Sequence, residues 1–404
     1  MAKVLFGWEF GGGLGHLTVL LPIAKALADR YEPVFVVKTL ARAGSLLAEE
    51  GEPMASASLL QAPRWPTLGD AAARETPVHS LADKLMMDGY GNVPLLYSNA
   101  RSWRDILRLV KPALVVGDFS PTLFLAARGL VSTIAVGIPF GLPPAGLPLP
   151  PIRPWEKALP PASQAAERDI LQAVRQVQGR LGRPPTDHLG DIFNGDRTIP
   201  CTIPEFDPYA RYRQTPTPLP VTVLELGPPQ PVAERPEGRV FVYLPANNPH
   251  LATTLEALRK LGLGGDVYVP GLPAALRQRY ASSALSLHDQ PLDLAEVLPR
   301  ARVAIHHGGH GISYAALRAG TPQLVLVNNL ERLVTAYGLD QLNCAVILNA
   351  DGKLEINAMV GYLRRLLTQD EIHQAVAQAA QNLAARQGES PIKTILEACE
   401  DALT

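Results

Sequence analysis

Short apolar runs alternate with amphipathic stretches along most of the chain. The apolar run at 3–8 enters a glycine cluster at 11–16, an apolar-periodic stretch follows, and residues 33–38 form the next apolar run. A buried strand, a glycine turn, a helix and a second buried strand make a βαβ unit with parallel strands. We expect Pro22 to lie within the first turn of this helix, because a proline farther inside would remove a backbone hydrogen bond.

The alternation continues and begins again in the second half of the chain. Residues 113–117 predict a buried strand that ends at Asp118. Later apolar runs predict further buried strands with helices between them, at 133–136, 239–244, 266–269, 302–305 and 323–327. The pattern predicts an α/β protein with two parallel sheets, and the length of 404 residues also favours two domains.

Proline-rich segments mark the expected boundaries. The chain has 38 prolines, about twice the usual share. They are dense at 139–161, which predicts an extended surface loop, and at 227–238, whose composition is typical of an interdomain linker. We therefore expect an N-terminal domain at 1–226, a C-terminal domain at 239–390 and a terminal helix at 391–404.

Charge and cysteine content argue against several classes of protein. The 37 Lys and Arg are balanced by 38 Asp and Glu, without the basic excess of a nucleic-acid binder. The three cysteines are too widely spaced for a zinc ribbon or a disulfide framework. No apolar run is long enough to span a membrane, and Glu9 interrupts the place where a signal peptide needs an apolar core. We therefore expect a soluble cytoplasmic protein.

A glycine-rich turn, HHGGHG, follows the strand predicted at 302–305 and precedes a predicted helix. Its backbone amides and the helix dipole favour an anion, and His306 and His310 would add donors. A ligand can approach the backbone closely at its three glycines, Gly308, Gly309 and Gly311. The turn is therefore a candidate phosphate or diphosphate site; the alternative is a tight turn with surface histidines. Zinc is less favoured, because the turn lacks the H-E-x-x-H spacing and nearby acidic or cysteine ligands.

The first glycine cluster, GGGLGH, lacks the G-x-G-x-x-G spacing of a dinucleotide site. It presents His16 at the start of a helix and at the carboxyl edge of the predicted sheet, where ligands of open α/β folds bind. A helix N-terminus disfavours the imidazolium, so we expect His16 to be neutral and able to accept a proton. Asp118 also ends a parallel strand. For both residues, capping of the next helix is the alternative.

These motifs resemble those of the GT-B nucleotide-sugar glycosyltransferases, and more closely the UDP-glycosyltransferase family with its bacterial natural-product members. AIHHGGHG at 304–311 is similar to the family's HHGGAGT motif, and LRAGTPQLVLV is similar to its ARAGVPQLVLP. GGGLGH resembles the turn that carries the family's catalytic histidine, and VVGDFSP at 115–121 resembles the strand end with its aspartate partner. The resemblance implies two Rossmann-like domains that face each other across a cleft. The N-terminal domain would bind the acceptor and the C-terminal domain the nucleotide sugar.

The resemblance also implies roles for individual residues. His16 would accept the acceptor proton, Asp118 would orient and balance the imidazolium, and His306 with the amides of the turn would hold the donor diphosphate. Further donor contacts fall, by position, on Asn247, Gln290, His310, Glu331 and Arg332. Several of these depart from the family pattern: Arg332 replaces a glutamine, Asn247-Asn248 replaces Gly-Ser, and the stretch before Gln290 lacks a tryptophan. Arg332 would favour a sugar carboxylate or else pair with Glu331.

The function expected from this resemblance is transfer of a sugar from a UDP- or dTDP-sugar to the hydroxyl of a small, apolar acceptor. The reaction would be inverting and would need no metal or other cofactor; the sequence shows no D-x-D carboxylate pair. Alternatives are a sugar-nucleotide epimerase, with Glu9 as an added acid/base group, and a non-catalytic binding protein. Side chains that could form the wall of an acceptor pocket are Trp65, Met86, Met87, Trp103 and Trp155; the alternative is that they belong to the core.

Overall fold

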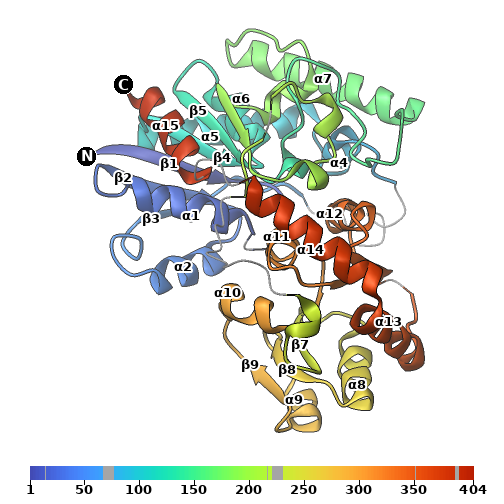
Figure 1. Ribbon diagram of the computed structural model, residues 1–404. Helices are drawn as coiled ribbons and strands as arrows, with labels where there is room; N and C mark the ends of the chain where they lie inside the picture. The colour runs from blue at the N-terminus through green and yellow to red at the C-terminus, as the bar shows by residue number, and fades with distance from the viewer. Residues whose placement is uncertain (14, 67–76, 216, 221–230, 351, 387–390) are drawn as a thin grey trace. The chain divides into compact units, whose positions relative to one another are not determined.

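The computed structural model describes residues 1–13, 15–66, 77–215, 217–220, 231–350, 352–386 and 391–404. The chain divides into two compact units (Figure 1). The first consists of Met1–Thr222 with Glu389–Thr404, and the second of Val223–Gly388. Residues 227–230 of the expected linker lie outside the described residues.

The first unit is built on a sheet of six parallel strands in the order β3-β2-β1-β4-β5-β6. The strands are β1 (Ala2–Trp8), β2 (Tyr31–Val37), β3 (Ser58–Gln61), β4 (Leu114–Asp118), β5 (Ser132–Gly137) and β6 (Arg197–Pro200). Helices cover both faces of a parallel sheet, so its strands are apolar on both sides. Accordingly, Val4 and Phe6 of β1 belong to one buried cluster and Leu5 belongs to another.

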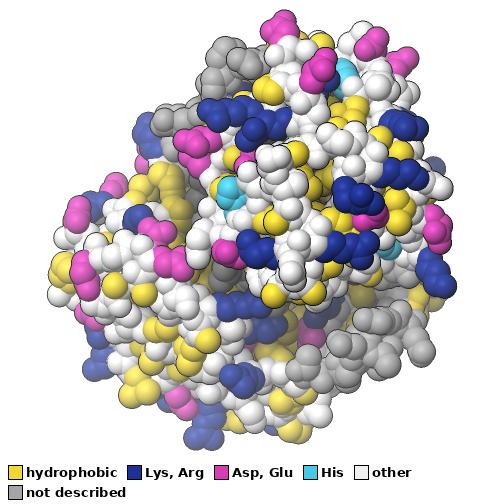
Figure 2. All heavy atoms as spheres, turned by 90° about the horizontal axis from the view of Figure 1, so that it is seen from below, with side chains coloured by type: hydrophobic (Ala, Val, Ile, Leu, Met, Phe, Trp, Pro, Cys, Tyr) yellow, Lys and Arg dark blue, Asp and Glu magenta, His cyan; other side chains and the backbone are white. Residues whose placement is uncertain are grey.

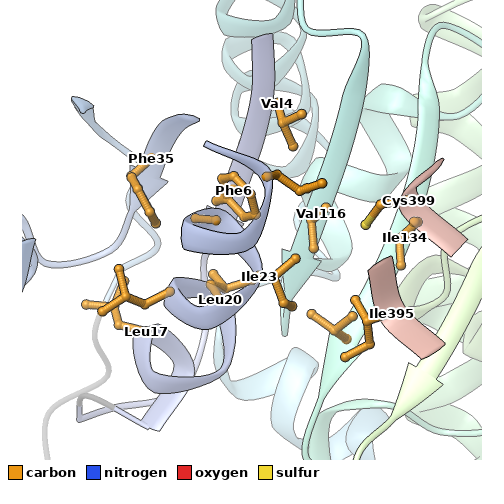
Figure 3. Close-up of a cluster of buried hydrophobic side chains, with 14 of the residues drawn as sticks. Val4, Phe6, Leu17, Leu20, Ile23, Phe35, Val116, Ile134, Ile395 and Cys399 are labelled. Carbon is orange, nitrogen blue, oxygen red and sulfur yellow. The ribbon is translucent and has the colours of Figure 1, made fainter. Parts of the chain in front are cut away.

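The helices of this unit are α1 (Gly15–Leu27), α2 (Leu40–Glu49), α4 (Leu81–Met87), α5 (Val93–Val110), α6 (Pro121–Ala127) and α7 (Pro161–Arg180). The expectation for Pro22 is wrong, because α1 continues through it for five more residues, to Leu27. A proline at this depth costs a helix about 3 kcal/mol. Leu17, Leu20 and Ile23 are buried against the sheet (Figure 3), and their burial offsets this loss.

The proline-rich stretch at 139–161 is an extended loop, as predicted, with one short 3₁₀ helix, η1 (Pro139–Gly141). It is not confined to the surface, however, since Leu142, Leu149 and Ile152 are buried. The next segments are η2 (Leu189–Phe193), η3 (Pro204–Phe206) and η4 (Ala210–Tyr212).

The last helix of the chain, α15 (Pro391–Leu403), belongs to the first unit. It packs against α1, β4 and β5. Ile395 and Cys399 point from α15 into the cluster that contains Val116 and Ile134 (Figure 3). Arg197 pairs with Asp401 at 3.0 Å near the same helix. The hydrophobic core on this face of the first sheet therefore includes side chains of α15, although the other residues of the cluster come from the first half of the chain.

The second unit has another sheet of six parallel strands, in the order β12-β11-β10-β7-β8-β9. The strands are β7 (Arg239–Tyr243), β8 (Gly264–Tyr268), β9 (Leu285–His288), β10 (Val303–His306), β11 (Gln323–Val327) and β12 (Ala345–Asn349). The helices are α8 (Leu251–Leu261), α9 (Ala274–Tyr280), α10 (Leu294–Val297), α11 (His310–Arg318), α12 (Leu330–Gln341), α13 (Ile356–Thr368) and α14 (Asp370–Ala385). Two more 3₁₀ segments are η5 (Val232–Glu234) and η6 (Leu298–Arg300).

A buried arginine holds the segment that carries β10 and α11. The guanidinium of Arg235 donates to the carbonyls of Ala301, before β10, and of Ala319 and Gly320, after α11. Its exposed fraction is 2%, and burial lowers its pKa to about 10. Arg235 therefore fixes both ends of the strand–turn–helix segment that contains the second glycine turn.

Both units have the strand order 3-2-1-4-5-6 when their strands are numbered separately. In this order the chain leaves the first and fourth strands in opposite directions, and ligands bind at the carboxyl edge between them. The relevant pair is β1 and β4 in the first unit and β7 and β10 in the second. The prediction of two Rossmann-like parallel-sheet domains is confirmed.

The described residues contain no helix with the length and apolar character that crossing a bilayer requires. On the face drawn in Figure 2, Lys and Arg side chains are interspersed with Asp and Glu side chains. This distribution agrees with the formal net charge of −1.

Candidate functional site

A buried histidine–aspartate pair lies at the carboxyl edge of the first sheet. His16 is the second residue of α1 and Asp118 is the last residue of β4. His16 Nδ1 lies 3.0 Å from Asp118 Oδ2, and the exposed fractions of the two residues are 7% and 2%. Because a carboxylate only accepts hydrogen bonds, it favours the tautomer that carries its proton on Nδ1. This tautomer leaves Nε2 as the basic nitrogen.

Two glycines enclose this pair. A Cβ added to Gly11 would stand 2.2 Å from His16 Nε2, and one added to Gly137 would stand 2.3 Å from Asp118 Oδ1. Both glycines also have positive φ, +81° and +137°, which other residues rarely adopt. The geometry of the His16–Asp118 pair therefore requires glycine at positions 11 and 137.

Asp118 is followed by a residue in an unusual backbone conformation. Phe119 has a φ of 43°, in the left-handed region that is uncommon for a bulky residue. Its carbonyl accepts from Phe10 N at 3.0 Å, and its ring packs against Phe10 and Phe193. Such strain persists only where the surroundings fix it, and it is concentrated at functional sites.

Glu9 is buried beside this site and fully engaged. Its carboxylate accepts from Trp65 Nε1 at 2.8 Å, Trp103 Nε1 at 3.3 Å and Thr122 N at 2.9 Å. Burial raises the pKa of Glu9 above its usual range. These contacts make Glu9 an anchor for two tryptophans. They do not favour it as the acid/base group of an epimerase.

The expected acceptor wall is placed only in part. Trp103 is fully buried and belongs to the core beneath α5, which is the alternative to a place in the pocket wall. Trp65 is half-buried and stacks on Tyr90, with ring centroids 4.5 Å apart. Met86 and Trp155 are exposed. Met87 is half-buried as well. Trp65 combines partial exposure with a hydrogen bond to Glu9.

In the second unit, His306 ends β10 but does not face a ligand. It is completely buried; its Nδ1 accepts from Gly308 N at 3.1 Å, and its Nε2 donates to Gln323 Oε1 at 2.9 Å. Burial lowers its pKa to about 4, so the ring is neutral. The expectation that His306 holds the diphosphate directly is not supported, because both ring nitrogens are already bonded. His306 instead shapes the turn.

His307, which the sequence analysis did not single out, has the available nitrogen. Its Nδ1 is buried and makes no hydrogen bond within the described residues. The ring stands edge-on to Tyr243 at 4.8 Å, and burial, with a smaller effect of Arg332, lowers its pKa to about 3. The pair of adjacent histidines, His306 and His307, could have indicated this in the sequence. Successive side chains of a strand point to opposite sides, so only one of the two can face inward.

The glycines of the turn differ in how much space surrounds them. Gly308 has a φ of +85°, and a Cβ there would stand 3.0 Å from Val325 and 3.2 Å from Arg332. A Cβ on Gly309 would stand 3.1 Å from His307 Nε2, whereas Gly311 has open space around it. His310 begins α11 and is buried, and burial lowers its pKa to about 4. The open backbone is thus at the start of α11, where helix amides favour an anion.

Polar atoms without partners also occur in the loop after β7, the neighbour of β10. Asn247 is exposed, whereas Asn248 is buried and accepts from His250 N at 2.9 Å. Asn248 Nδ2 and His250 Nε2 are buried and lack hydrogen-bond partners within the described residues. A buried polar group left unsatisfied costs about 1–3 kcal/mol. A bound ligand at this edge would remove that cost, and it would do so through Asn248 more readily than through the expected Asn247.

The other expected donor contacts lie on the same edge of the sheet. Arg332, in the first turn of α12, donates to Asn328 Oδ1 at 2.6 Å, and burial lowers its pKa. Glu331 precedes it and is half-buried. Gln290 is exposed after β9, three strand spacings from β10, or about 14 Å. Only a ligand with the length of a nucleotide would contact both Gln290 and the turn.

The described residues contain no group of three or more His, Cys, Asp or Glu side chains that could hold a metal ion.

Part of the second unit matches a known protein family. Residues 289–399 match the family described as erythromycin biosynthesis protein CIII-like, C-terminal domain. This segment contains the second glycine turn. The sequence matches none of the curated proteins.

Solved structures of natural-product glycosyltransferases share the fold along the whole chain. The calicheamicin glycosyltransferase CalG4 aligns with a TM-score of 0.66 and 18% identity, over 100% of this chain and 98% of its own. The glycosyltransferase VinC, solved with dTDP, gives 0.66 and 16%, over 99% of both chains. The spinosyn rhamnosyltransferase SpnG, solved with spinosyn aglycone, gives 0.65 and 16%, over 98% of this chain and 100% of its own. These matches confirm the GT-B fold and the resemblance to bacterial natural-product glycosyltransferases.

Proposed function

We propose that this GT-B protein is a glycosyltransferase that moves a sugar from a nucleoside-diphosphate sugar, UDP- or dTDP-linked, to an acceptor hydroxyl. The observation that carries the proposal is the buried His16–Asp118 pair, 3.0 Å apart at the carboxyl edge of the first sheet. Open α/β sheets bind ligands between these two strands. A histidine held by a buried carboxylate is a general base whose cationic form the carboxylate stabilises.

In the proposed reaction, the acceptor hydroxyl gives its proton to His16 Nε2 as its oxygen attacks the anomeric carbon. The bond from that carbon to the diphosphate oxygen breaks, and the nucleoside diphosphate leaves with the electron pair. A single displacement from the opposite face inverts the anomeric centre. Asp118 stabilises the imidazolium, and a base of this kind contributes about 10²–10⁴-fold to the rate.

The second unit would bind the donor. The amides at the start of α11, with His307 and Asn248, would hold the diphosphate, whose negative charge grows as it leaves. His306 and His310 would shape the turn, and Glu331 and Arg332 would contact the sugar. Asn247 and Gln290 would contact the rest of the nucleotide. Because neutral donors and Arg332 supply the stabilisation, we propose that no metal is required. The dTDP bound to VinC supports this assignment.

A labelled nucleotide sugar, incubated with and without a mixture of hydroxylated small molecules, tests the proposal. Label should pass to an acceptor only when one is present, with release of the nucleoside diphosphate. The spinosyn aglycone bound to SpnG supports a small-molecule acceptor. An isomerised nucleotide sugar in the absence of acceptor would show an epimerase. No turnover with any UDP- or dTDP-sugar would contradict the proposal.

A further inference from the structure

Lys38 is held in place at both ends on the same sheet edge as His16. It directly follows β2, and its backbone carbonyl accepts from Gln61 Nε2 at 3.0 Å. Its Nζ donates to the carbonyl of Gly11 at 2.8 Å. A surface lysine is normally free to change rotamer, and most gain little from a fixed position. Two hydrogen bonds, one to the backbone carbonyl and one from the side chain, therefore fix the position of Lys38.

The contact with Gly11 places this ammonium beside the proposed base. Gly11 is the residue whose Cβ would stand 2.2 Å from His16 Nε2, so Lys38 binds the peptide that covers this nitrogen. Several other lysines pair with carboxylates, among them Lys3 with Glu32 and Lys25 with Glu50. Within the described part of the chain, no carboxylate lies at ion-pair distance from Lys38.

A second lysine, Lys84 on α4, is near enough to act on Lys38 electrostatically. Lys84 pairs with Asp88 and lies 5.8 Å above the ring of Phe10. Burial lowers the pKa of Lys38, and the charge of Lys84 lowers it further, while Asp88 and Glu9 act in the opposite direction. Asp88 pairs with Lys84, whereas the carboxylate of Glu9 lies beyond ion-pair distance of Lys38 and accepts from two indoles and a backbone amide. Among the described residues, the ammonium of Lys38 is thus left without a direct ion-pair partner.

We propose that Lys38, assisted by Lys84, binds an anionic group of the acceptor, and that the acceptors of this protein are hydroxy acids. This inference rests on the glycosyltransferase function proposed above. A carboxylate fits best, because it could form the ion pair that Lys38 lacks among the described residues. The apolar body of the acceptor would lie against Trp65, which is half-buried and stacked on Tyr90. A neutral apolar acceptor would leave the ammonium of Lys38 with its hydrogen bond to Gly11 and no ion pair.

The test is calorimetric titration of the full-length protein, without donor, with a panel of phenolic hydroxy acids and their methyl esters. A hydrogen bond to a charged group contributes enough to favour each acid by about ten-fold or more. The preference should weaken as salt is raised. Lys38→Met should reduce it to about two-fold or less, whereas Lys38→Arg should keep most of it. Lys25→Met, which removes a lysine elsewhere on the same unit, should change nothing.

Several outcomes would overturn the proposal. One is a panel in which no acid binds more tightly than its ester. Another is an unchanged preference in the Lys38→Met, Lys84→Met double variant. A third is an equal loss of acid and ester binding in Lys38→Met, with an unchanged melting temperature, because a residue that only holds Gly11 would affect both ligands alike. If the acids bind as expected but no nucleotide sugar is turned over, the proposed function fails and the anion site remains.

Discussion

The carboxylate of Asp118 lies so close to Gly137 that a Cβ on this glycine would stand 2.3 Å from Oδ1. The two residues end neighbouring strands, β4 and β5. Gly137 also has a φ of +137°, a conformation that side chains rarely adopt. The first sheet thus provides space for the carboxylate by omitting a side chain on the next strand.

Gly137→Ala should therefore displace Asp118 from His16. We expect kcat to fall by about 10²-fold or more, because a base in the wrong position loses much of its contribution. The strained backbone should also lower stability by about 1–3 kcal/mol. Steady-state kinetics and denaturation test both effects. Gly179→Ala, in α7 with open space around it, is the matched control and should leave both unchanged or raise stability slightly. Normal kinetics in Gly137→Ala would show that the pair tolerates displacement.

The pair itself should act as one unit. His16→Ala should lower turnover by about 10²–10⁴-fold, and Asp118→Asn should lower it as well. The double variant should be little worse than His16→Ala, since groups that act together are not additive. Nucleotide binding should survive in all three, because the glycine turn that we assign to the donor lies in the other unit. Losses that multiply would show independent roles. Full activity in His16→Ala would mean that this histidine only caps α1.

The core of the first unit should depend on the last helix of the chain. Ile395 is completely buried between α15 and the sheet, so Ile395→Ala should destabilise the protein by about 2–5 kcal/mol. Ile356, on α13, is 38% exposed and provides the control, whose change to Ala should have a small effect. Urea denaturation measures both. Equal, small effects would show that α15 does not contribute to the stability of this unit.

Hydrophobic periodicity and the glycine turns were enough to predict both parallel sheets. Short apolar runs that alternate with helices are typical of buried strands in a parallel sheet. The same patterns placed His16 and Asp118 at one edge, since parallel strands end together. They could not show how side chains are oriented at a strand end. The family resemblance implies a diphosphate contact for His306, and only the fold shows that His306 is enclosed with Gln323.

Long-range packing accounts for the other differences. Residue 235 lies in a segment whose composition is typical of a linker, yet Arg235 is buried because carbonyls from residues 301, 319 and 320 converge on it. Pro22 is tolerated inside α1 because the helix is held by core contacts. Gln61 and Lys38 carry no motif, and their relation to Gly11 arises only when three strands lie side by side.

The buried histidines should make stability depend on pH. His306, His307 and His310 have pKa values lowered to about 4, 3 and 4, below the ordinary value of about 6.5 in an unfolded chain. Between pH 6.5 and 4 the unfolded state therefore binds more protons than the folded state. Stability is complete above pH 6.5 and falls toward pH 4, by up to about 1.4 kcal/mol per pH unit for each histidine. Urea denaturation across this range should show a smaller slope in His306→Gln than in the wild type. An unchanged slope would show that His306 does not contribute.

Nucleotide binding should separate the two histidines of the doublet. UDP or dTDP should raise the melting temperature, with stabilisation of about 2.7 kcal/mol at a hundred times the dissociation constant. GDP, ADP and NAD complete the panel, and a response to NAD alone would contradict the donor assignment. His307→Ala should weaken the nucleotide response with little change in the unliganded melting temperature, because its Nδ1 has no partner to lose. His306→Ala should lower the unliganded melting temperature as well, because it leaves Gln323 and Gly308 N without their partners. A nucleotide response weakened in His306→Ala but unchanged in His307→Ala would indicate that His306, and not His307, contacts the nucleotide.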